Sequence, residues 1–149
     1  MTSKYHKRSR KTGLAPGSLV HIGSPYAEKS KITLMQYNEG FFEAKDLESL
    51  KDFQADKDKE IITWLNVDGL TDIQLFEEIG RIFGLHPLVL EDILNTAQRP
   101  KMEDYGGYIY LVARNFHDQE NGSLLFEQIS IILGKNFILS FREKESNLF

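Results

Sequence analysis

The feature that most constrains the fold is an amphipathic segment, Thr71 to Phe83, that ends abruptly at a glycine. Its apolar residues recur at helical spacing and form one stripe: Ile73, Phe76, Ile79, Ile82 and Phe83. A stripe of this kind needs an apolar surface to pack on, and Gly84 is the residue type that readily ends a helix. We therefore predict a helix over residues 71–83, with Thr71 as its N-cap, packed on a larger apolar element.

A second, shorter helix is predicted directly after the first. Pro87 suits the first turn of a helix, the apolar run continues to about Asn95, and Pro100 forbids further helix. His86 lies between the glycine stop and Pro87, where we interpret it as a loop-capping residue and not as a metal ligand.

Strand patterns surround the two helices, together with one further helical pattern. We predict strands at 19–22, 31–37, 41–44, 61–67, 108–116, 125–133 and 137–141, and a helix at 46–53 that begins at Asp46. Residues 61–67 are apolar on both faces, which is typical of a buried central strand. The predicted fold class is α+β, with an α/β/α-like arrangement in which helices flank a mixed, largely antiparallel sheet. Its predicted core includes Trp64, Phe76, Ile79, Leu90 and Ile131.

Charge divides the chain into a tail and a body. The first twelve residues carry five basic side chains and no acid, so the net charge of −4 divides into +5 for this tail and −9 for the rest. We predict a flexible basic tail over 1–12 and one domain over 13–149. The acidic body argues against a nucleic-acid partner. The chain has no cysteine, no phosphate-binding glycine loop, no nucleophile elbow and no apolar run of the roughly 20 residues that cross a bilayer.

The candidate ligand residues are Glu91 and Asp92. In the predicted second helix, apolar residues take up most of the circumference and leave these two acids on the remaining side. Carboxylate oxygens are the hard ligands that Mg²⁺ and Ca²⁺ prefer. On the residues alone, a solvated helix face explains the pair more simply than a metal site does.

The run from Gly84 to Lys101, GLHPLVLEDILNTAQRPK, resembles the signature of the CorA metal-ion transporter family. Three other segments resemble further parts of that family: the loop at 12–17, the Trp-containing strand at 63–67, and residues 128–133. The resemblance implies the amino-terminal cytoplasmic domain of a homopentameric Mg²⁺/Co²⁺ channel of the cell (inner) membrane. It also implies regulatory Mg²⁺, and possibly Co²⁺, bound between neighbouring domains, with Asp92 and Glu91 as ligands.

Parts of that family pattern are missing from the sequence. It contains no Gly-Met-Asn selectivity motif, stalk helix or membrane helix. We therefore expect a domain truncated before the stalk, which reaches the membrane through missing helices, binds Mg²⁺ weakly and does not form the pentamer by itself. The expectation is that the chain is not an enzyme. Three alternatives remain open: a related zinc transporter, a soluble enzyme that uses Glu91 and Asp92 as an acid/base pair, and an interaction module without ion sensing.

Overall fold

The computed structural model describes residues 15–20, 30–51, 53, 60–118 and 124–144. The predicted basic tail, residues 1–12, lies outside these ranges. The elements follow the order β1 (Lys31–Tyr37), β2 (Phe42–Leu47), β3 (Ile62–Asp68), α1 (Ile73–Phe83), α2 (Pro87–Leu94), β4 (Lys101–Asp104), β5 (Tyr108–Asp118), β6 (Leu124–Gly134) and β7 (Phe137–Arg142).

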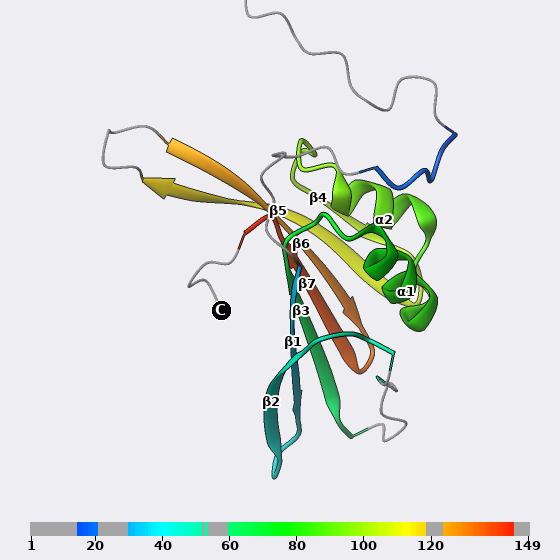
Figure 1. The fold of residues 1–149 in the computed structure, drawn as a ribbon, viewed down its shortest axis with the longest axis vertical. Helices are drawn as coiled ribbons and strands as arrows, with labels where there is room; N and C mark the ends of the chain where they lie inside the picture. The colour runs from blue at the N-terminus through cyan, green and yellow to red at the C-terminus, as the bar shows by residue number, and fades with distance from the viewer. Residues whose placement is uncertain (1–14, 21–29, 52, 54–59, 119–123, 145–149) are drawn as a thin grey trace, which may run out of the picture.

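The seven strands within the described ranges form one mixed sheet in the order β2-β1-β3-β7-β6-β5-β4 (Figure 1). Every neighbouring pair is antiparallel except β3 and β7, which run parallel with Leu65 opposite Leu139. The last strand thus lies in the middle of the sheet, between the N-terminal hairpin with β3 and the C-terminal meander. The predicted class, a mixed and largely antiparallel sheet with helices, is confirmed.

Helix α1 is capped by Asp72 at its N-terminus and by Gly84 at its C-terminus. Asp72, and not the predicted Thr71, is the N-cap, because its Oδ1 atom accepts a hydrogen bond of 3.1 Å from the backbone N–H of Leu75. At the other end Gly84 adopts a left-handed φ of 65°, which an L-residue with a side chain adopts only at a cost.

Only two residues, Leu85 and His86, separate the Gly84 cap from the start of helix α2 at Pro87. The Nδ1 atom of His86 accepts a hydrogen bond of 3.2 Å from the N–H of Leu88, so His86 is the N-cap of α2. Its predicted role was the more general one of a loop-capping residue. Pro87 occupies the first turn, and Asn95 follows the last helical residue. The short connection holds the two helices side by side on the same face of the sheet (Figure 1).

The core lies between the two helices and the sheet face that they cover. The ring of Phe76 on α1 packs against Phe141 on β7, with a centroid distance of 5.5 Å. Ile79 and Leu90 are buried in the same cluster, so three of the predicted core residues are confirmed. Each buried side chain of this size contributes roughly 1.5–3 kcal/mol.

The other two predicted core residues, Trp64 and Ile131, lie on the opposite face of the sheet, so their prediction as core residues is wrong. Side chains alternate along a strand, so the neighbours of Leu65 on β3 point away from the helices. Trp64 and Ile131 lie on this second face and are half-buried. Other apolar side chains on the same face are exposed, among them Phe42, Met102, Ile109, Leu111 and Leu133.

A chain of polar contacts crosses this second face between β3 and β7. The Nε1 atom of Trp64 donates to Ser140 Oγ at 2.9 Å, and Ser140 Oγ donates to Asn66 Oδ1 at 2.7 Å. Asn66 Nδ2 donates to Asp68 Oδ2 at 3.0 Å, and the guanidinium of Arg142 pairs with Asp68 Oδ1 at 2.7 Å. The Asp68–Arg142 ion pair is almost fully buried.

The structure departs from the sequence prediction in three further places. The predicted helix at 46–53 is wrong, because β2 extends to Leu47 and the described residues after it form bends and a turn. Asp46 pairs with Thr33 of β1 and does not cap a helix. The short strand β4 was not predicted, and Leu19 and Val20, the described part of the predicted strand 19–22, have no regular structure.

Candidate functional site

The two predicted ligand residues lie on α2, but their side chains have different partners. The Oε2 atom of Glu91 accepts a hydrogen bond of 2.7 Å from the backbone N–H of Gly17. Gly17 has a φ of 83°, and a Cβ atom there would lie 3.3 Å from Pro87. Glu91 therefore fastens the loop at residues 15–18 to the surface of α2.

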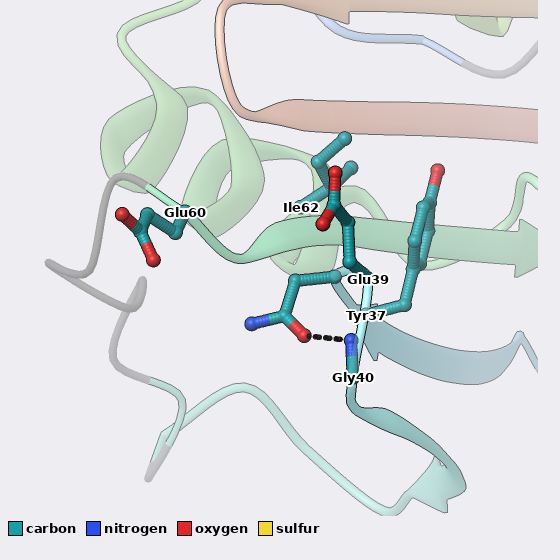
Figure 2. A pocket seen from close by; sticks show the side chains of 6 residues that line it. Tyr37, Glu39, Gly40, Glu60 and Ile62 are labelled. Carbon is teal, nitrogen blue, oxygen red and sulfur yellow. Dashed lines mark hydrogen bonds between the residues drawn. The ribbon is translucent and has the colours of Figure 1, made fainter.

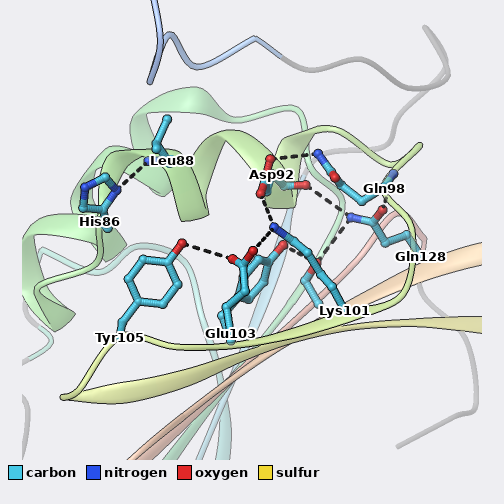
Figure 3. Close-up of polar contacts among 10 residues, drawn as sticks. His86, Leu88, Asp92, Gln98, Lys101, Glu103, Tyr105 and Gln128 are labelled. Atoms are coloured by element: carbon cyan, nitrogen blue, oxygen red, sulfur yellow. Dashed lines mark hydrogen bonds and ion pairs between the residues drawn. The ribbon is translucent and has the colours of Figure 1, made fainter.

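Asp92 points toward β4 and the connection that leads to it (Figure 3). Its Oδ2 atom lies 2.7 Å from the Nζ atom of Lys101, and its Oδ1 atom accepts a hydrogen bond of 2.8 Å from Gln98 Nε2. The Asp92 side chain is 25% exposed. The adjacent acids thus do not face solvent as one pair, and each holds a separate part of the chain.

Lys101 is the centre of a larger polar network. Its Nζ atom also lies 3.0 Å from Glu103 Oε1 and 5.4 Å from the centroid of the Tyr110 ring. The Oε2 atom of Glu103 accepts a hydrogen bond of 3.2 Å from the hydroxyl of Tyr105. One ammonium group therefore joins two carboxylates and the face of an aromatic ring.

A glutamine pair holds the other side of Asp92. The backbone N–H of Gln98 donates to Gln128 Oε1 at 3.1 Å, while Gln128 Nε2 donates to the backbone oxygen of Asp92 at 3.3 Å (Figure 3). The 95–100 connection is tied to β6 in this way. The orientation of the Asp92 carboxylate is consequently fixed independently of Lys101.

These contacts shift several pKa values. Partial burial by itself would lower the pKa of Lys101, but the hydrogen bonds from Lys101 to Asp92 and Glu103 outweigh it and raise the pKa. The hydrogen bond from Lys101 lowers the pKa of Glu103. Burial raises the pKa of the Tyr110 hydroxyl. Lys101 is therefore firmly cationic at neutral pH.

The carboxylates of Glu91 and Asp92 are suitable Mg²⁺ ligands, but they supply only part of the ligands that a Mg²⁺ site needs. Partly exposed carboxylate oxygens are suitable ligands, and Mg²⁺ is usually held by one or two of them together with water. Within the described ranges, however, no three His, Cys, Asp or Glu side chains cluster in a way that could hold a metal ion. Any Mg²⁺ bound at Asp92 would need further oxygen ligands from elsewhere.

Surface hollows on the described residues lie away from the acids of α2. One, about 810 Å³, is formed at the β1–β2 turn by residues that include Glu39, Gly40 and Glu60. Figure 2 shows that the carboxylates of Glu39 and Glu60 point in different directions, while the N–H of Gly40 donates to the Asn38 side chain at 2.9 Å. Another, about 370 Å³, has an apolar lining that includes Phe42 and Trp64.

The sequence analysis named Glu91 and Asp92 as candidate ligands but did not predict the side chains that contact Asp92. Gln98 and Lys101 stand six and nine residues after it, at spacings that no regular element brings together. Their proximity results from the turn after α2 and from β4, which was not predicted. One feature of the sequence could have indicated these partners: Gln98 and Lys101 lie in the same run, residues 84–101, as the two acids.

The chain is similar over most of its length to proteins described as divalent-ion transporters. Residues 59–149 match the family described as CorA-like Mg²⁺ transporter protein. The Cobalt/magnesium transport protein CorA of Thermotoga maritima is 42% identical over 145 residues, which cover 95% of this chain and 40% of that protein. The chain belongs to the CorA-like family. The family consists of transporters, in agreement with the expectation that the chain is not an enzyme.

Solved structures show the same fold. The full-length CmaX protein has a TM-score of 0.63 at 15% identity, covering 83% of this chain and 38% of that one. The soluble domain of CorA from Methanocaldococcus jannaschii has a TM-score of 0.54 at 12% identity, covering 75% and 41%. This chain spans about 40% of the length of the Thermotoga maritima CorA protein. Neither helix in the described part of the chain is long and apolar enough to span a bilayer.

Proposed function

We propose that this chain is the cytoplasmic regulatory domain of a Mg²⁺/Co²⁺ transporter in the cell membrane, and that it senses intracellular Mg²⁺ through Asp92 and Glu91. The observation that carries the proposal is the position of the two acids. They lie on α2, partly exposed, within a chain of the CorA-like family whose Thermotoga maritima relative is named for cobalt and magnesium transport.

The acids of α2 act as half of a shared site in this proposal. Asp92 and Glu91 each offer carboxylate oxygens, and the remaining ligands come from water and from a neighbouring subunit of a homopentamer. Acids of two neighbours repel one another unless a cation lies between them. Bound Mg²⁺ therefore favours the arrangement in which the neighbours are close, which is a shift of population toward a closed state.

This division of the site has a consequence for the isolated chain. With only part of the ligand set, it should bind Mg²⁺ weakly, with a dissociation constant on the order of millimolar. It should also remain smaller than a pentamer at micromolar concentration, because interfaces that lack most of their area are weak. Light scattering that shows a pentamer would contradict this part of the proposal.

A chimeric transporter tests the regulatory function directly. Residues 13–149 would replace the matching segment of the Thermotoga maritima relative, and ion flux would be measured in liposomes against internal Mg²⁺. Asp92→Asn removes charge with little change in shape, so closure should need more Mg²⁺. The control is Glu39→Gln, an exposed acid in the β1–β2 turn. An inhibition curve that Asp92→Asn leaves unshifted would remove Asp92 from the sensing site.

A further inference from the structure

Lys101 contacts the Asp92 carboxylate, the group that would bind Mg²⁺ in the proposed site. Its Nζ atom is 2.7 Å from Asp92 Oδ2, a distance typical of a strong charge-assisted hydrogen bond. The side chain of Lys101 is 26% exposed, similar to that of Asp92. This carboxylate therefore already has a cationic partner within the protein, which it shares with Glu103.

Lys101 has a second anionic partner when it leaves Asp92. Glu103 Oε1 lies 3.0 Å from the same Nζ atom, and the hydroxyl of Tyr105 holds the other Glu103 oxygen. The Tyr110 ring, 5.4 Å away, also favours a cation at this place. A small movement of the lysine head toward Glu103 would free Asp92 Oδ2 without leaving an unpaired ammonium group.

Asp92 itself would keep its orientation during such an exchange. Gln98 Nε2 holds the Oδ1 atom at 2.8 Å, and the Gln98–Gln128 contacts tie this segment to β6. The arrangement thus combines a fixed carboxylate with a lysine that has two partners.

We propose that Lys101 is an internal competitor for the Asp92 carboxylate, so that Mg²⁺ binds Asp92 only by displacing Lys101 toward Glu103. This inference rests on the proposed function and adds a regulatory residue to it. The lysine makes the site less sensitive to Mg²⁺ than a free carboxylate would be, and thereby sets the Mg²⁺ concentration to which the domain responds.

The first test is a Mg²⁺ titration of the 149-residue chain at constant ionic strength, followed by the amide NMR signal of Asp92. Lys101→Met removes the competing charge and keeps an unbranched side chain over Tyr110. A partly exposed ion pair of this kind should weaken binding by about fivefold, so the variant should bind Mg²⁺ about fivefold more tightly. Lys45→Met is the control, because Lys45 pairs with Glu43 on β2, away from α2.

The second test uses the unaltered chain, so it does not depend on how well a variant folds. The rate at which an amine-acylating reagent modifies Lys101 should rise as MgCl₂ is added and should saturate together with the Asp92 signal. The modification rate of Lys45 should not change. In Asp92→Asn, Lys101 should react faster from the start, and MgCl₂ should have no further effect.

The outcomes separate this inference from the proposed function. If the Asp92 signal saturates with Mg²⁺ while Lys101→Met binds no more tightly or Lys101 reactivity stays constant, Lys101 is not a competitor and the proposed sensing site remains. If the Asp92 signal does not respond at Mg²⁺ concentrations well above the millimolar order expected of such a site, the site and the inference are both overturned.

Discussion

Removing the cation of the buried Asp68–Arg142 pair should destabilise the fold more than removing any surface cation. Arg142 is 2% exposed and Asp68 is 6% exposed, and they are opposite one another in the parallel β3–β7 pair. Arg142→Met would remove the guanidinium that lies 2.7 Å from Asp68 Oδ1 and keep the hydrogen bond from Asn66 to Asp68 Oδ2. Breaking a buried pair in this way costs about 3–5 kcal/mol.

The free energy of unfolding can be measured in urea through Trp64, the single tryptophan of the chain. Trp64 is part of the same chain of polar contacts, since its Nε1 atom donates to Ser140. The double variant Asp68→Leu/Arg142→Met removes both charges, so it should be more stable than Arg142→Met alone. The surface variant Lys45→Met should change stability by less than about 1 kcal/mol.

Two results would refute this reasoning. A cost below about 1 kcal/mol for Arg142→Met would mean that water reaches the Asp68 carboxylate and solvates it. A double variant as unstable as the sum of the two single variants would mean that the charges do not interact, despite their contact.

Three further predictions concern caps and pH. Asp72→Ala removes the N-cap of α1 and should cost about 1 kcal/mol in urea unfolding, whereas Asp72→Ser should restore most of the loss. Gly84→Ala places a side chain at a φ of 65° and should cost about 1–2 kcal/mol, and an unchanged midpoint would show that the cap can rearrange. Because the pKa of Glu103 is lowered in the folded state, its contribution to stability is present above its unfolded value near 4.5 and is lost as the pH falls through the lower folded value. Glu103→Gln should therefore flatten the pH dependence of the thermal midpoint in that acidic range, and an unaltered profile would contradict the assigned shift.

The strands and helices with strong periodicity were predictable from the sequence, because their patterns depend on local spacing. The alternation in β1 and the apolar stripe of α1 each identify one buried face, and the structure buries those faces. Residues 46–53 misled the prediction because Leu47, Leu50 and Phe53 have helical spacing and do contact the core. They reach it from the end of a strand and the turn after it, since pairing with β1 determines the conformation up to Leu47.

Residue type and the signature-like run led to Glu91 and Asp92 as candidate ligands, and their ligand role stays a prediction. The contacts of the two side chains were not predictable, because side-chain direction depends on tertiary structure. Gly17 is 74 residues from Glu91 in the sequence, and the Asp92–Lys101 contact depends on the turn before β4. Likewise, a strand that is apolar on both sides does not reveal which face the helices cover, which is why Trp64 was misplaced.

The central position of β7 has a consequence for synthesis on the ribosome. The sheet remains in two parts, β2-β1-β3 and β6-β5-β4, until residues 137–142 emerge from the exit tunnel. Before then the inner edges of β3 and β6 have no partner, and unpaired edges invite wrong pairing. Helices α1 and α2 also lack Leu139 and Phe141 as packing partners during this interval. Folding should therefore be completed late and in one step. Nascent chains in which β7 is still missing or inside the exit tunnel should be sensitive to protease, and chains in which β7 has emerged should be resistant.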